Sequence, residues 1–219
     1  LSAMIVQKQD LLALIHEAKQ RGKRVAVGEP YPTSIPEDAL AAGADYLILD
    51  EGEITLPLFV QAIEQGQLQG IFRSNGEKPD VTDTPIPRFD LLELDAYDSM
   101  SVQFSRGCPF QCEFCDIIVL YGRKPRTKTP AQLIAELDRL YELGWRRAIF
   151  MVDDNFIGNK RNVKLMLQEL KSWMAEHQYP FSFNTEASID LAQDPELMQL
   201  MVECNFNAVF LGIETPDAD

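Results

Sequence analysis

Three cysteines lie close together in the segment RGCPFQCEFC: three residues separate Cys108 from Cys112, and two separate Cys112 from Cys115. Thiolates suit iron–sulfur clusters because iron is bound well by soft, anionic sulfur. Four cysteines would saturate a cubane cluster, whereas three leave one iron open to a small molecule. The number and kind of these ligands therefore predict a 4Fe–4S cluster with one open coordination position.

Two other kinds of site compete with this prediction. Zinc usually needs a second pair of cysteines or nearby histidines, and a ferredoxin-like electron carrier needs a fourth cysteine. The remaining cysteine, Cys204, ends a predicted short helix, where a buried thiol is expected. His16 and His177 lie on predicted helices far from the triad in sequence. These alternatives are disfavoured by the residue inventory.

Polar side chains follow the predicted strands after the triad. Asp153, Asp154 and Asn155 come directly after an apolar run, Glu186 lies in the next strand, and Glu214 ends the last one. In α/β barrels, reactive groups sit at the carboxyl ends of the strands. These residues are candidate cofactor contacts, with capping of the following helices as the alternative role.

The second half of the chain alternates strand and helix patterns. We expect strands at 101–105, 148–152, 181–188 and 208–214, separated by helices at 130–143, 160–177 and 195–204. Thr129, Pro130 and Gln132 supply an N-cap, a first-turn proline and a capping-box partner. A closed barrel needs more units than these four strands and three helices.

The first half also alternates strand and helix patterns. We expect a strand end at 3–6, strands at 24–28 and 45–50, and helices at 8–20, 37–42 and 54–65. A proline-rich turn precedes the helix at 37–42. Nearly continuous apolar strands indicate a parallel sheet covered on both faces. This α/β pattern suggests the later half of a doubly wound domain at 1–70, a proline-rich linker with one or two short elements at 71–100, and a partial barrel at 101–219. Position 1 falls inside an expected strand, so the chain is expected to be part of a longer protein.

The composition of the chain limits the kinds of molecule that it is expected to bind. The formal net charge of −14 argues against nucleic acid, since phosphate binding needs clustered basic residues. A basic stretch, YGRKPRTKTP, is expected to be a solvated loop or a lid or docking segment. No apolar run approaches the roughly 20 residues that cross a bilayer, and no signal peptide is visible, so a cytoplasmic location is expected.

The triad, with the aromatic Phe114 directly before its last cysteine, resembles the motif of the radical S-adenosylmethionine (SAM) superfamily. The resemblance implies that the open iron binds the amino and carboxylate groups of SAM. Reductive cleavage of SAM would then release a 5′-deoxyadenosyl radical that abstracts hydrogen. It also implies a SAM-amino contact from Asp153 or Asp154, where the family has a Gly-Gly-Glu-like motif, and a SAM contact from Glu214.

The first half, through VAVGEPYPTSIPE and AAGADYLILDEGEITLP, resembles the cobalamin-binding domain of one radical SAM class, and the triad region is most similar to its hopanoid C-2 methylase branch. The family often has Gly-Gly-Pro where this chain has Gly28-Glu29-Pro30. The resemblance implies cobalamin-dependent methylation of an unreactive carbon in a lipid or other small molecule, with an external electron donor such as flavodoxin or ferredoxin. Radical rearrangement or cyclisation, and tRNA methylthiotransferase-like activity, are the alternatives.

Overall fold

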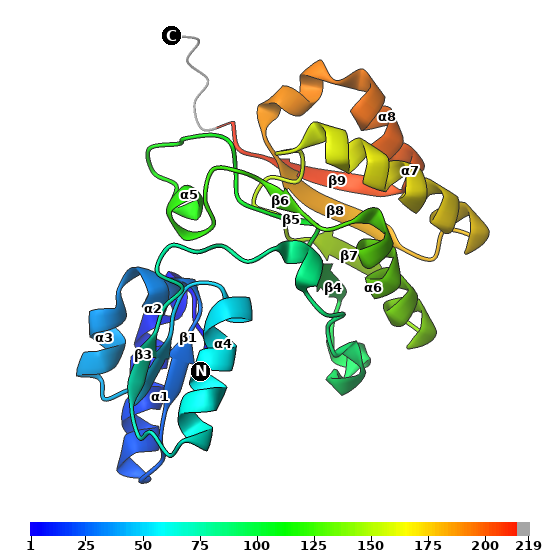
Figure 1. Cartoon of the computed structure of the whole chain (residues 1–219). Helices are drawn as coiled ribbons and strands as arrows, with labels where there is room; N and C mark the ends of the chain where they lie inside the picture. Colours follow the sequence, from blue (N-terminus) through cyan, green and yellow to red (C-terminus); the bar gives the residue numbers. More distant parts are fainter. Residues whose placement is uncertain (214–219) are drawn as a thin grey trace. The chain divides into compact units, whose positions relative to one another are not determined.

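The computed structural model describes residues 1–213, so Glu214 lies outside the described residues. The chain forms two compact units (Figure 1). The first unit contains Leu1–Pro79 and Val119–Tyr121, and the second contains Asp80–Ile118 and the chain from Gly122 onward. The coarse prediction of an α/β protein with parallel sheets is confirmed, since each unit is built on one. The three-part division at 70 and 100 stays a prediction.

The first unit has a three-stranded parallel sheet of β1 (Ala26–Gly28), β2 (Tyr46–Ile48) and β3 (Gly70–Phe72), in that order. Its helices are α1 (Lys8–Gln20), α2 (Pro30–Ser34), α3 (Pro36–Ala41) and α4 (Gly52–Glu64). Leu11 and Ile15 of α1 are buried against β1 and β2, as their helical spacing predicts. On α4, Phe59 packs edge-on between Tyr46 and Phe72, with ring centroids 5.2 and 5.8 Å apart.

Three details of the first unit differ from expectation. Residues 3–6 are not a strand end: only Ser2 bridges to Gly28, and Ile5–Gln7 form a 3-10 helix. The proline-rich turn contains α2, because Pro30 occupies the first helical turn, where a missing N–H costs nothing. The expected linker, for which one or two short elements were predicted, begins inside β3, which pairs with β2 and so belongs to the sheet; β3 is too short to show a strand pattern in sequence.

The second unit has a four-stranded parallel sheet in the order β4 (Ser99–Val102), β7 (Ala148–Met151), β8 (Ser182–Ala187) and β9 (Phe206–Leu211). The helices between these strands are α6 (Pro130–Glu142), α7 (Lys160–Glu176) and α8 (Pro195–Glu203). The predicted alternation is therefore confirmed, although β4 and β9 begin two residues earlier than expected. The capping box is present, with reciprocal bonds between Thr129 and Gln132.

The two faces of this sheet differ. One face packs on α6, α7 and α8 through a large apolar core that includes Ile149, Met151 and Phe183. Burying a side chain of this size stabilises the fold by about 1.5–3 kcal/mol. Phe183 and Phe206 stack at 5.1 Å, and both tryptophans of the chain, Trp145 and Trp173, are buried in this core. The opposite face is left for Asn184 and Glu186, which alternate with the core residues of β8.

Three short elements near the triad were not predicted. An antiparallel pair joins β5 (Ser105–Arg106) to β6 (Arg126–Thr127), so the expected strand 101–105 is two strands, β4 and β5. Helix α5 (Ile117–Leu120) follows the third cysteine. Among the helices that the structure describes, none is long and apolar enough to cross a membrane.

Candidate cofactor-binding site

The three cysteines lie in one loop, Cys108–Cys115, which we call the cysteine loop. It runs from β5 to α5, and its backbone bonds join Cys115 N to the Cys112 carbonyl and Cys108 N to the Gly122 carbonyl. All three thiols are free, with Cys112 exposed and the other two half-buried. Phe114 is 73% exposed. The donor set therefore fits an iron–sulfur cluster in kind and number, although residues 1–213 contain no preformed group of three metal-binding side chains.

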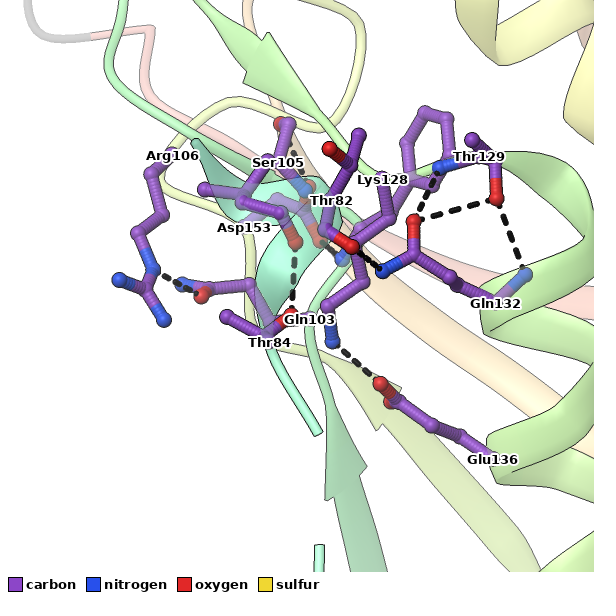
Figure 2. A network of polar contacts seen from close by, with 12 residues as sticks. Thr82, Thr84, Gln103, Ser105, Arg106, Lys128, Thr129, Gln132, Glu136 and Asp153 are labelled. Atoms are coloured by element: carbon purple, nitrogen blue, oxygen red, sulfur yellow. Dashed lines mark hydrogen bonds and ion pairs between the residues drawn. The ribbon is translucent and has the colours of Figure 1, made fainter. Parts of the chain in front are cut away.

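Asp153 anchors the start of this segment (Figure 2). Its fully buried carboxylate follows β7 and accepts hydrogen bonds from Phe104 N at 3.0 Å, from Ser105 Oγ at 2.6 Å and from Ser105 N. Burial raises the pKa of Asp153 to about 6, and the bonds from Ser105 and Phe104 oppose that rise. Asp153 thus ties the end of β7 to the chain that leads into the cysteine loop.

A buried ion pair fixes the chain just after β6, which follows the cysteine loop in sequence (Figure 2). Lys128 N donates to the Phe104 carbonyl at 2.8 Å, and Lys128 Nζ lies 2.5 Å from Glu136 Oε1 on α6. Burial raises the pKa of Glu136, with Lys128 opposing the rise. Lys128 is therefore neither a solvated nor a lid residue, whereas Arg123 and Lys124 are exposed. The sequence could not reveal this pair, because Glu136 lies almost two helical turns into α6.

Asp154 differs from its neighbour. Its Oδ2 is buried and has no hydrogen-bond partner among the described residues. Burial raises the pKa of Asp154 to about 6; a backbone bond from Gly107 lowers it, and the charges of Glu186 and Asp116 raise it further. An unpartnered buried carboxylate oxygen beside the cysteine loop is able to accept a hydrogen bond from a cationic group.

Asn155 is 4% exposed and connects two strand ends to the triad. Its Nδ2 lies 3.8 Å from Cys108 Sγ and 3.0 Å from Ser188 Oγ, just after β8. Asp154 and Asn155 therefore approach the cysteine loop from one sheet edge. Asn155 was predicted as a cofactor contact, but Ser188 was not singled out by its sequence.

The polar face of β8 carries Glu186, which is exposed, and Asn184, whose Oδ1 is buried without a partner among the described residues. Asn184 was missed in the sequence, although the alternation in FSFNTEAS places it on the same face as Glu186. Glu214 lies outside the described residues, so its role stays a prediction.

The other candidate ligands are used elsewhere. Cys204 is fully buried with its Sγ 3.2 Å from the Leu167 carbonyl, and burial raises the pKa of this thiol to about 12. His177 stacks on Trp173 at 4.2 Å, and His16 contacts Gln20 within α1. These three side chains therefore have partners away from the triad.

A parallel sheet whose carboxyl edge meets a three-cysteine loop defines an α/β protein with the donors of an iron–sulfur site. Residues 102–219 match the family model of the radical SAM superfamily. The chain belongs to that superfamily, whose members use a 4Fe–4S cluster and SAM.

Curated relatives extend the similarity over the whole chain. It is 75% identical over 219 residues to an uncharacterized methyltransferase of Synechocystis sp. and 39% identical over 220 residues to the hopanoid C-2 methylase of Rhodopseudomonas palustris. These alignments cover 100% and 99% of this chain and 41% of each relative. The chain thus spans about two fifths of the length of these relatives.

Solved structures share the fold. The cobalamin-dependent radical SAM enzyme OxsB, described with aqua-cobalamin and SAM bound, matches with a TM-score of 0.75 at 20% identity, over 98% of this chain and 35% of its own. The radical SAM methyltransferase TsrM of Kitasatospora setae matches with a TM-score of 0.75 at 17% identity, over 97% of this chain and 45% of its own.

Proposed function

We propose that the protein is a cobalamin-dependent radical SAM methyltransferase that methylates an unreactive carbon of a lipid or secondary metabolite. The observation that carries the proposal is the free cysteine triad beside the buried, unpartnered Oδ2 of Asp154. Relatives named as hopanoid and bacteriochlorophyllide methyltransferases support carbon methylation. Flavodoxin or ferredoxin would supply the electron, and the protein would act in the cytoplasm.

Cys108, Cys112 and Cys115 are proposed to hold the cluster. When bound, the cluster supplies the electron that splits SAM into methionine and a 5′-deoxyadenosyl radical. Asp154 is the acid that we assign to the SAM amino group, because the carboxylate of Asp153 is engaged by Phe104 and Ser105. Its carboxylate oxygen would gain the partner that it lacks in this structure.

The remaining assignments follow from position. Glu186 and Asn184 share the polar face of β8, where they could bind the ribose or the substrate. Phe114 is exposed on the cysteine loop and could cover the adenine. Glu214 completes the proposed SAM contacts. The second unit is proposed to be the first four strands of a partial radical SAM barrel.

The first unit is proposed to be the later half of a doubly wound cobalamin-binding domain. In such sheets, ligands bind outside the carboxyl ends of the strands. Here those ends are tied together: Asp50 N donates to Thr33 Oγ1 at 2.9 Å, and Asp50 Oδ2 accepts from Ser74 N at 2.9 Å. When bound, cobalamin supplies the methyl group for transfer.

Glu29 bears on the fit of cobalamin at this edge. Its backbone has φ +84° and ψ 178°, a conformation that glycine adopts readily and other residues rarely do. The family's Gly-Gly-Pro backbone is thus compatible with this loop despite the substitution. Glu29 differs from the family's glycine only by its side chain. That side chain is exposed and can point away from a corrin ring that approaches the backbone.

The test uses the intact protein, reconstituted with iron and sulfide without oxygen and given SAM with a deuterated methyl group, a reductant, cobalamin and a hopanoid lipid fraction. We expect 5′-deoxyadenosine and a deuterated methyl group in a lipid product. Replacing any triad cysteine by Ala should abolish SAM cleavage, whereas Cys204→Ala should retain it. Absence of SAM cleavage by the reconstituted protein would exclude the radical SAM activity.

Cyclisation without methyl transfer is the second candidate, because one relative at 22% identity is named an anaerobic magnesium-protoporphyrin IX monomethyl ester cyclase. The same labelling experiment separates the two activities. Formation of 5′-deoxyadenosine with no label in any product would favour cyclisation or rearrangement.

A further inference from the structure

Asn155 lies where the ends of β7 and β8 meet the first cysteine of the triad. We propose that Asn155 is a positioning residue that donates one N–H to the sulfur of Cys108, and that Ser188 and Asp190 hold its amide in the orientation for this bond. The inference rests on the proposed function in taking Cys108 as a cluster ligand. It adds a determinant of the cluster's reduction potential that lies outside the cysteine loop.

The hydrogen bonds around the amide determine which end faces the sulfur. Ser188 N–H donates to Asn155 Oδ1 at 3.3 Å, and a backbone N–H needs an acceptor, so the oxygen faces Ser188 N. Nδ2 then has two hydrogens to place. One points to Ser188 Oγ at 3.0 Å, and the other points to Cys108 Sγ at 3.8 Å, within reach of a bond to a large sulfur atom.

The next residues in the chain of contacts reinforce that orientation. Ser188 Oγ lies 2.5 Å from Asp190 Oδ1 and must donate to it, because a carboxylate only accepts. The hydroxyl oxygen is therefore left to accept from Asn155 Nδ2. Asp190 is itself held by Lys160, with Nζ 2.7 Å from Oδ2. A flipped amide would place the Nδ2 donor against the Ser188 N–H donor and Oδ1 against the accepting Ser188 Oγ, and it would lose the bond to sulfur.

Burial strengthens the hydrogen bond from Asn155 to the sulfur of Cys108. Asn155 is 4% exposed, so water competes little for its N–H groups. A hydrogen bond to a ligand sulfur stabilises negative charge on that sulfur, and reduction adds negative charge to the cluster. The donor should therefore favour the reduced state. Partners behind a ligand commonly tune a metal centre in this way.

The test measures the midpoint potential of the cluster in the reconstituted intact protein by a redox titration followed by electron paramagnetic resonance. Asn155→Leu removes the donor without adding charge, and Ser188→Ala leaves the donor but removes its restraint. Asn162→Leu is the matched control: Asn162 is on α7, and its Nδ2 donates to Thr127 Oγ1 at 2.7 Å instead of to a sulfur.

We expect Asn155→Leu to make reduction about tenfold less favourable, which is about 59 mV for a one-electron couple. Ser188→Ala should shift the potential in the same direction by less, and Asn162→Leu should leave it unchanged. An unchanged potential in a fully loaded Asn155→Leu protein would overturn the proposal. If that variant does not hold a cluster, Ser188→Ala decides: a lowered potential supports the proposal, and an unchanged one overturns it.

The wild-type protein separates this inference from the proposed function. Failure of the wild type to bind a cluster would contradict the proposed function itself. A wild-type cluster that cleaves SAM, together with potentials that do not respond to Asn155 or Ser188, would leave the proposed function intact and overturn only the inference.

Discussion

At the scale of single residues, Asp153 and Asp154 are adjacent acids with different tasks. Asp153 is surrounded by donors from Phe104 and Ser105, whereas Asp154 keeps a buried oxygen without a partner among the described residues. One carboxylate therefore maintains the structure at the start of the cysteine loop. The other remains available for a ligand.

Asp153→Ala should destabilise the protein by about 3 kcal/mol, because it leaves buried N–H and hydroxyl donors without an acceptor. Urea denaturation of the cluster-free protein at pH 7 measures this loss. Ser105→Ala, which removes only the hydroxyl donor, should cost about 1 kcal/mol. Equal losses for the two variants would show that the carboxylate does not act as the common acceptor.

Asp154→Asn should change how stability depends on pH. Burial raises the pKa of Asp154 from 3.8 to about 6, so this group stabilises the fold below about pH 4, and that contribution is lost as pH rises through 6. Asparagine does not titrate. The variant should therefore gain about 3 kcal/mol relative to wild type between pH 4 and pH 6. A constant difference across that range, in denaturation of the cluster-free proteins, would contradict the raised pKa.

The sequence identified the triad and the acids after β7 because their types and spacing are visible along the chain. It could not distinguish Asp153 from Asp154, since that depends on which carboxylate faces Phe104 and Ser105, about 50 positions earlier. Ser188 was missed for the same reason. Its role comes from a neighbour, Asn155, on another strand end.

At the scale of elements, the ion pair between Lys128 and Glu136 fastens α6 to the chain after β6. Both side chains are buried, and Glu136 Oε2 lacks a partner among the described residues. A buried pair offers little net stability over apolar residues, but loss of one partner leaves an unpaired buried charge. The pair therefore matters to the stability of the fold mainly because loss of either partner leaves the other charge buried and unpaired.

Lys128→Met should destabilise the protein by about 3–5 kcal/mol, because Glu136 would lose its counter-charge. The double variant Lys128→Met, Glu136→Leu should recover most of that loss. Denaturant midpoints of the wild type and the two variants provide the measurement. A double variant no more stable than Lys128→Met would contradict this account.

The long helices were predicted from sequence, whereas several of the shortest strands were not. Helices α1, α6 and α7 run for three turns or more, so their apolar spacing is unambiguous. The strands β3, β5 and β6 have two or three residues each. No periodicity can be seen at that length, and their pairing depends on partners elsewhere in the chain.

At the scale of the whole molecule, the edge strand β9 exposes apolar side chains. It pairs only with β8 among the described strands, and Phe210 is 69% exposed. An exposed apolar edge is a template for pairing with other chains. We therefore expect this edge to make the isolated 219-residue chain prone to aggregate as its concentration rises.

Phe210→Lys should reduce that aggregation, because a charge on an edge strand discourages intermolecular pairing. Static light scattering of purified chains at increasing concentration gives the comparison. Val202→Lys on the exposed side of α8 adds the same charge away from the edge and serves as the control. An equal benefit from both variants would indicate a general effect of charge.

The two buried tryptophans make the intrinsic fluorescence of the protein report on only one of its two units. Trp145 and Trp173 are the chain's whole complement, and both lie in the core of the second unit. Intrinsic tryptophan emission will therefore follow the melting of that unit alone and be silent to the first. Circular dichroism records the helices of both units, so the two signals recorded on one sample will tell whether the units unfold together or one after the other.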